Sequence, residues 1–201
     1  MTAALCIAQK MMQNYNMNIE DFKLYISSLD NAFRVSKGTA LNKRKINIIQ
    51  KRMDFKFPQD YIDFLNCFGS LHIEVCEDVW PRIKNLGAAP YWIYQYGVIA
   101  MGISENIPDN LNVEKIYYHF QNKYNPEIKI VPVFKQIMIT EYYYCLDESG
   151  AVYFWAFDEP WPKRILDNFF KRFYTYIEEL KGNKDYIVNN KKEIYGYFKQ
   201  S

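Results

Sequence analysis

The chain has 201 residues, of which 49% are hydrophobic and 18% aromatic, and this apolar content excludes a chain that stays unfolded. Its 25 Lys and Arg nearly balance its 23 Asp and Glu, and a formal net charge of +2 does not favour nucleic acid as a partner. The length fits one domain with a substantial core. The 18 Tyr also favour a tyrosine-rich binding face, because their hydroxyls prefer a partly wet environment.

Helical patterns come first along the chain. Apolar residues at helical spacing predict a helix over residues 3–15 and, after the capping residue Asn18, a second and antiparallel helix over 19–33. Gly38 interrupts this pattern, and Thr39 is predicted to cap a third helix. The apolar face of that third helix consists of Ile46, Ile49 and Met53.

Residues 57–69 contain the signals of a short, well-delimited helix. Pro58 suits the first helical position, Asp60 places an acid in the first turn, and Gly69 stands just past the end. Its apolar face consists of Tyr61, Leu65 and Phe68.

Beyond Gly69 the chain consists mainly of short runs rich in aromatic and β-branched residues, which predict strands. These runs are residues 71–76, 91–103, 128–134, 137–146 and 151–157. The last two are predicted to form a hairpin across residues 147–150, in which Tyr153 and Trp155 face one way and Phe154 the other. We expect helices to cover one face of the sheet and the other face to be a partly exposed aromatic platform.

Three further helices complete the predicted order. A weak one is expected over 111–124, an amphipathic one from Leu166 to Gly182, and a last one over 185–198. This order predicts an α+β fold with an antiparallel or mixed sheet and helices on one side. The predicted units are an N-terminal helical extension (1–38), an α+β domain (39–182) and a C-terminal helix (183–201).

The cysteines and the hydrophobic runs indicate a cytoplasmic protein. Cys6, Cys67, Cys76 and Cys145 are widely spaced among apolar neighbours, which predicts buried, reduced thiols. The sequence shows no signal peptide, and its apolar runs are shorter than the roughly 20 residues of a membrane span. We expect no membrane association.

No catalytic motif stands out. His72 and His119, the two histidines, are predicted to be structural or surface residues, and neither they nor the cysteines have metal-ligand spacing. We expect no metal, no cofactor and no enzymatic activity. A hydrolase using Glu74, Glu77 or Asp78 stays open as an alternative, because the distances between these carboxylates are not visible in the sequence.

Trp, Tyr and Arg are concentrated in two turn-rich stretches, residues 78–97 and 158–162. These residue types dominate binding hot spots, although large aromatics also cover the ends of sheets as core residues. The candidate partner contacts are Trp80, Arg82, Trp92, Tyr94, Tyr96, Asp109, Trp155 and Trp161.

Several segments together resemble one known family. The helix Phe57-Pro58-x-x-Tyr61-x-x-Phe64-Leu65-x-x-x-Gly69 is similar to the opening helix of SUKH-superfamily domains, which include a yeast cell-wall assembly regulator. The later strands resemble the family through Val131-Pro132-Val133, Tyr144-Cys145-Leu146-Asp147 and Gly150-x-Val152-x-x-Trp155. Together with the aromatic helix from Leu166, the resemblance covers about residues 39–180.

The resemblance implies an intracellular, non-enzymatic immunity protein, because many bacterial relatives bind and neutralise a toxin domain. The expected partner is the C-terminal domain of a cognate toxin, and no nucleic acid is expected. The nearly balanced charge argues against a basic nuclease as that toxin, since its inhibitor would be acidic. The alternative is a scaffold or regulatory module of the cell-wall-regulator kind, for which a homo-oligomer is expected.

Overall fold

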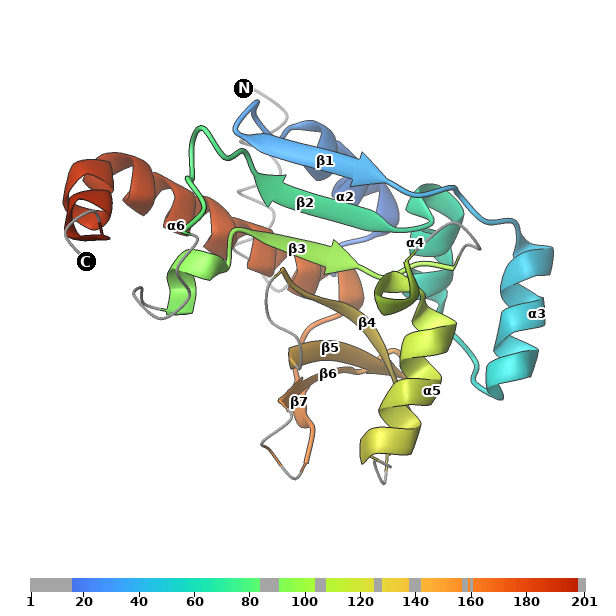
Figure 1. The fold of residues 1–201 in the computed structure, drawn as a ribbon. Helices are drawn as coiled ribbons and strands as arrows, with labels where there is room; N and C mark the ends of the chain where they lie inside the picture. The colour runs from blue at the N-terminus through green and yellow to red at the C-terminus, as the bar shows by residue number, and fades with distance from the viewer. Residues whose placement is uncertain are drawn as a thin grey trace.

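In the part of the chain that the structure describes, seven antiparallel strands form one sheet, and they follow one another in chain order across it (Figure 1). The computed structural model describes residues 16–83, 91–103, 108–124, 128–137, 142–156, 159 and 161–198. The predicted helix over 3–15 lies outside the described residues. The strands are β1 (Phe33–Lys37), β2 (Leu71–Val75), β3 (Gly97–Ala100), β4 (Ile130–Gln136), β5 (Tyr142–Asp147), β6 (Val152–Ala156) and β7 (Lys163–Ile165).

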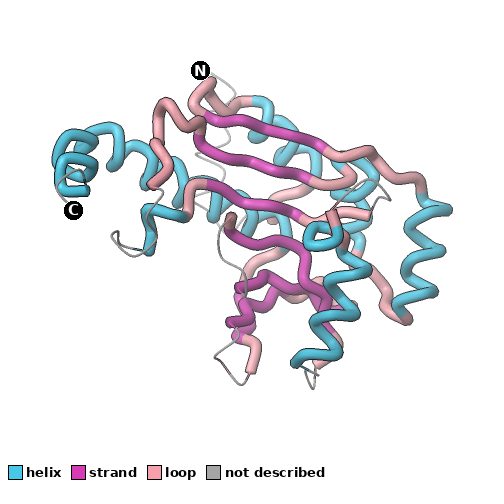
Figure 2. The backbone as a smooth tube through the Cα atoms, viewed as in Figure 1, coloured by secondary structure: helices cyan, strands magenta, loops and turns pink. Residues whose placement is uncertain are grey.

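Helices separate several of these strands, as Figure 2 shows by colour. They are α2 (Ile19–Ser27), α3 (Lys43–Met53), α4 (Gln59–Phe68), α5 (Val113–Tyr124) and α6 (Phe169–Phe198), with short 3-10 turns η1 (Tyr91–Tyr94) and η2 (Asp109–Leu111). Asn18 caps α2 as predicted, by accepting hydrogen bonds from the backbone N–H groups of Glu20 and Asp21. Asn42, and not Thr39, caps α3.

The main core lies between one face of the sheet and three helices, α2, α4 and α6, which lie behind the sheet in Figure 1. Phe22 of α2 is fully buried, with its ring 5.4 Å from that of Phe170 and 5.2 Å from that of Phe173, both on α6. Phe134 of β4 stacks on Phe173 at 5.0 Å. Aromatic pairs at these separations stabilise the core beyond the area that they bury.

The helix α5 is placed differently. Its residue Phe120 packs edge-on against Trp155 of β6 at 5.4 Å, in a second cluster with Ile130, Cys145 and Tyr153. In Figure 1 this helix lies in front of the lower strands, opposite α6. The sheet is therefore covered by helices on one face, and α5 additionally covers part of the other.

The α+β class, the antiparallel sheet and the β5–β6 hairpin are confirmed. Among the local predictions, the helix over 57–69 is also confirmed: it is α4, and it ends at Gly69 with φ of 67°. A side chain at Gly69 would collide with Thr39, because a Cβ would come within 2.0 Å of the Thr39 carbonyl oxygen.

Besides the cap of α3, three local predictions are wrong, and two strands were not predicted. The second helix ends at Ser27 and not at residue 33, and the strand β1 that follows was not predicted. The run 91–103 begins with the turn η1 and becomes strand only at Gly97. The strand β7, which precedes the last helix, was not predicted. Finally, α6 does not end at Gly182 but continues to Phe198, with one non-helical residue at Asn190.

Of the free thiols in the described part of the chain, Cys145 is fully buried, whereas Cys67 and Cys76 are only partly buried. Burial raises the pKa of the Cys145 thiol well above its ordinary value. None of the helices in the described ranges is both long enough and apolar enough to cross a membrane.

Candidate partner-binding face

The residue pattern of β2 shows which side chains lie on the face of the sheet that α2, α4 and α6 leave uncovered. Residues of β2 alternate, so that Leu71, Ile73 and Val75 are buried toward the helices. His72 and Glu74 therefore project from the opposite face and are only partly buried.

The strand register continues this surface across four strands. Ser36 of β1 pairs with His72, His72 pairs with Ile99 of β3, and Ile99 pairs with Lys135 of β4. Arg34 pairs with Glu74 in the neighbouring row. We call this surface the open face, and it consists of Arg34, Ser36, His72, Glu74, Ile99 and Lys135.

Glu74 is the carboxylate of the open face and is already surrounded by basic groups. Its Oε1 lies 3.2 Å from Nη1 of Arg34, and its Oε2 lies 3.5 Å from Nη2 of Arg82 and 4.0 Å from Nε2 of His72. Because Glu74 is mostly buried and Arg34 is mostly exposed, the carboxylate holds the arginines in place and leaves part of their positive charge at the surface.

Arg82 borders the open face and is held rigidly. Its guanidinium lies 3.5 Å from the centre of the Tyr96 ring and donates hydrogen bonds to the carbonyl oxygens of Trp80 and Val75. A planar guanidinium suits stacking and forked donation of this kind, which a lysine could not reproduce.

Lys135 is the other cation of the open face, and its surroundings differ from those of the arginines. Its side chain is partly buried, and its Nζ lies 5.5 Å from the centre of the Tyr143 ring. Burial lowers the pKa of Lys135, because it disfavours the charged form. No carboxylate in the described ranges forms an ion pair with it.

Beyond Lys135, at β5 and β6, the helix α5 covers this face of the sheet. Tyr143 pairs with Trp155, and Phe120 of α5 packs against both rings. Trp155 is only 4% exposed as a result. The predicted aromatic platform is therefore wrong at this point: the aromatic part of the surface is covered by α5, and the exposed part is polar.

The structure separates the predicted contact residues. Arg82 and Tyr96 lie together at the border of the open face. Trp80 is fully buried and donates its indole N–H to the carbonyl oxygen of Ile93 at 2.9 Å. Trp80 and Trp155 are therefore core residues, which was the alternative interpretation of these aromatics. Tyr94 is partly buried against the main core.

The remaining predicted contacts do not join the open face. Asp109 is exposed at the start of η2 and pairs with Lys115 at 2.5 Å. Trp161 is 55% exposed and precedes β7, at the sheet edge opposite β1. The side chain of Trp92 lies outside the described residues. Whether any of these residues contacts a partner stays a prediction.

Sequence reasoning missed most of the open face. The alternation of apolar and polar residues in β2 could have placed His72 and Glu74 on one face. Arg34 and Ser36 could not be placed, because β1 was not recognised as a strand. Lys135 has no local signal, since its position depends on the pairing of β4 with β3.

The C-terminal part of α6 holds the loop that carries Arg82. Nζ of Lys191 donates to the carbonyl oxygen of Asp78 at 2.9 Å, and the hydroxyl of Tyr195 donates to that of Pro81 at 2.8 Å. Burial raises the pKa of Tyr195 to about 12, against a smaller opposing effect of Arg82. The tyrosine therefore stays protonated as a donor at neutral pH.

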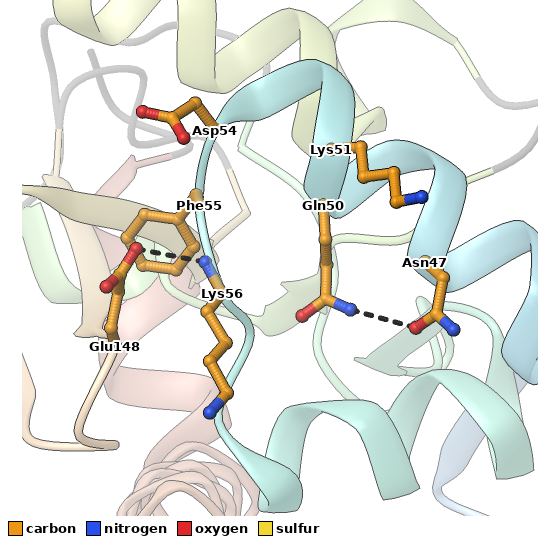
Figure 3. A pocket seen from close by; sticks show the side chains of 7 residues that line it. All are labelled: Asn47, Gln50, Lys51, Asp54, Phe55, Lys56 and Glu148. Carbon is orange, nitrogen blue, oxygen red and sulfur yellow. Dashed lines mark hydrogen bonds between the residues drawn. The ribbon is translucent and has the colours of Figure 1, made fainter.

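A depression of about 410 Å³ lies elsewhere, between the end of α3 and the β5–β6 turn (Figure 3). It is lined by Asn47, Gln50, Lys51, Asp54, Phe55, Lys56 and Glu148. Both of its carboxylates are engaged: Lys129 lies 3.0 Å from Asp54 and 3.8 Å from Glu148, and Glu148 also accepts from the backbone N–H of Lys56. This arrangement offers no free acid and base pair.

The carboxylates of the hydrolase alternative have different surroundings. Glu74 is held between arginines, whereas Glu77 and Asp78 are exposed in the turn after β2. Within the described ranges, no group of three or more His, Cys, Asp or Glu is arranged to hold a metal ion.

Comparison with known families bears on the predicted resemblance. The model of the SMI1 / KNR4 family (SUKH-1) matches residues 40–176, which is more than half of the chain. The chain belongs to the SMI1/KNR4 family. A comparison with curated proteins finds no significant match. In this SUKH-1 chain the open face falls within the matched range except for Arg34 and Ser36, and the α6 residues that hold the Arg82 loop lie beyond it.

Proposed function

We propose that this SUKH-1 chain is a non-enzymatic, cytoplasmic immunity protein that neutralises a toxin domain by stoichiometric binding through the open face. The observation that carries the proposal is membership of the family. The resemblance to SUKH-superfamily domains implies this function, because many bacterial members of that superfamily are immunity proteins. The open face gives the proposal a location, since it is a polar surface of four adjacent strands bordered by a rigid arginine and tyrosine.

The arrangement of titratable groups favours binding over catalysis. Glu74 is engaged by Arg34 and Arg82, and His72 lies at the edge of ion-pair distance from the same carboxylate. A general base must reach a substrate proton with a free lone pair, and both carboxylate oxygens of Glu74 lie within 3.5 Å of a guanidinium nitrogen. These groups suit charged recognition instead.

The second candidate function is a scaffold or regulatory module. It is favoured by Tyr186 and Val188 of α6, which are 54% and 49% exposed and lie beyond the range matched by the family. The part of this helix that lies outside the family's range offers a second copy of the chain an additional surface to pack against. This candidate predicts a homo-oligomer with several weak partners, and a monomer in analytical ultracentrifugation would contradict it.

The test is recovery of the partner from the native cell. The tagged protein is isolated at moderate salt, co-purifying proteins are identified by mass spectrometry, and each is expressed alone and together with this chain. One dominant partner that is toxic alone and harmless in co-expression is the predicted result. Several weak and non-toxic partners would instead support the scaffold, and a partner that kills equally with and without this chain would contradict the immunity proposal.

A further inference from the structure

The open face carries a surplus of positive charge. Among the described residues, Arg34 and Lys135 of the open face and Arg82 at its border are basic, and Glu74 is the one carboxylate of the open face. The whole chain has a formal net charge of only +2, so the surplus is a property of this face and not of the composition. A surface of this kind attracts acidic groups and repels basic ones.

Lys135 differs from the two arginines in having no described ionic partner. Arg34 and Arg82 share Glu74, whereas Nζ of Lys135 lies 5.5 Å from the centre of the Tyr143 ring and forms no ion pair with a residue that the structure describes. A partly buried ammonium group without a counter-ion is costly, and the lowered pKa of Lys135 reflects the same desolvation. A carboxylate brought by another molecule would remove this cost.

The neighbours of Lys135 restrict the shape of what binds there. Ile99 lies beside it on β3, and the Tyr143 ring lies beside it on β5. On the far side of Ile99 lies the imidazole ring of His72, which is partly exposed although its Nε2 atom is turned inward, 4.0 Å from Oε2 of Glu74. Polar and apolar side chains therefore alternate along this row, from His72 through Ile99 and Lys135 to Tyr143. Each comes from the next strand of the sheet, and neighbouring strands are about 4.8 Å apart. An extended peptide laid across the strands would meet them in turn.

From this arrangement we propose that the open face binds an acidic segment of a protein partner, with a Glu or Asp carboxylate seated on Lys135 and a second one near Arg34. The inference rests on the proposed function for the identity of the partner, but it specifies the chemistry of the contact independently. It also agrees with the argument that a basic nuclease is not the toxin, since such a protein would be repelled by this face.

The test uses a short peptide of Glu and Tyr, a counterpart in which Gln replaces Glu, and single-stranded DNA as a different polyanion. Each is titrated into the ¹⁵N-labelled full chain, and backbone amide shifts are followed at physiological salt. We expect the Glu peptide to perturb β1–β4 and the Gln peptide to leave them unchanged. Lys135→Met should weaken binding of the Glu peptide about tenfold, as expected for a lost charge-assisted contact.

Two variants control for folding and for general charge. Lys135→Arg retains a cation and should retain binding, whereas Lys45→Met removes an exposed lysine of α3 and should have no effect. Equal binding by wild type and Lys135→Met, or tighter binding of DNA than of the Glu peptide, would overturn the inference.

Failure here and failure of the proposed function give different results. If the chain cancels toxicity but does not bind the Glu peptide, only the inference that an acidic segment binds the open face is contradicted. A chain that binds the peptide through Lys135 but cancels no toxicity contradicts only the immunity proposal.

Discussion

Gly182 is an exposed residue in the interior of α6. A glycine after an amphipathic stretch usually marks a helix end, yet α6 passes through Gly182 and ends only at Phe198, with a kink at Asn190. The continuation is stabilised by tertiary contacts of later residues, including the fully buried Ile187 and the hydrogen bond from Tyr195. Such contacts are not readable from the local sequence.

The same position gives a direct prediction. Gly182→Ala should raise the free energy of unfolding by about 0.5–1 kcal/mol, because alanine loses less backbone entropy in a helix and nothing lies within 4 Å of the added Cβ. Urea denaturation of both proteins measures the difference. The matched control, Gly69→Ala, should be destabilising, since its φ is 67° and its Cβ would collide with Thr39. A lower midpoint for Gly182→Ala would show that α6 does not pass regularly through this residue.

Asp147 gives a pH-dependent prediction. Partial burial raises its pKa, but hydrogen bonds from Ser149, Ala151 and Tyr153 outweigh that effect, so the net pKa is lowered. A lowered folded pKa means that the stabilisation is present above the ordinary value of about 3.9 and is lost as the pH falls through the folded value.

Asp147→Asn should therefore destabilise the β5–β6 hairpin by about 1 kcal/mol at neutral pH. The difference between wild type and variant should shrink as the pH falls below about 5 and through the lowered pKa of folded Asp147, since the wild-type carboxylate becomes protonated there. Unfolding free energies across this range provide the measurement. A difference that stays constant with pH would mean that the charge of Asp147 does not contribute.

At the scale of elements, the sequence predicts those helices and turns whose ends are determined by neighbouring residues. The helix α4, with its proline, acid and glycine, and the β5–β6 hairpin, with its short turn, were both predictable. The edge strands β1 and β7 were not. They are five and three residues long, and β1 pairs with a strand more than thirty residues away, so that no nearby turn indicates it. Short, charged edge strands also protect against edge-to-edge aggregation, which weakens their apolar pattern.

The contact between α6 and the Arg82 loop is the element-scale feature most relevant to the site. Tyr195→Phe removes the hydrogen bond to Pro81 and should leave the loop carbonyl less well satisfied, at a cost of about 1 kcal/mol. We expect faster amide hydrogen exchange in residues 78–82 and unchanged exchange in the β5–β6 hairpin. As a control, Tyr186→Phe alters an exposed tyrosine of the same helix. Equal exchange in the loop of Tyr195→Phe and of wild type would contradict a restraining role for α6.

At the scale of the whole molecule, residues before the matched range take part in the sheet and the core. The strand β1 supplies Arg34 and Ser36 to the open face, and Phe22 of α2 is fully buried between α4 and α6. Phe22→Ala should cost about 3–5 kcal/mol of unfolding free energy, which approaches the total stability of many domains. Differential scanning calorimetry would measure it, with Leu24→Ala, an exposed residue of α2, as the control. A cost equal to that of Leu24→Ala would contradict the packing of α2 into the core.

The most direct measurement of the central claim is growth of cells that express the recovered toxic partner together with variants of this chain. The wild type and the control Lys45→Glu should restore growth. The double variant Arg34→Glu, Lys135→Glu should not, because it reverses the charge of the open face while leaving the helical core untouched, and its circular dichroism should match that of wild type. Full rescue by the folded double variant would show that the toxin is bound elsewhere and would contradict the account.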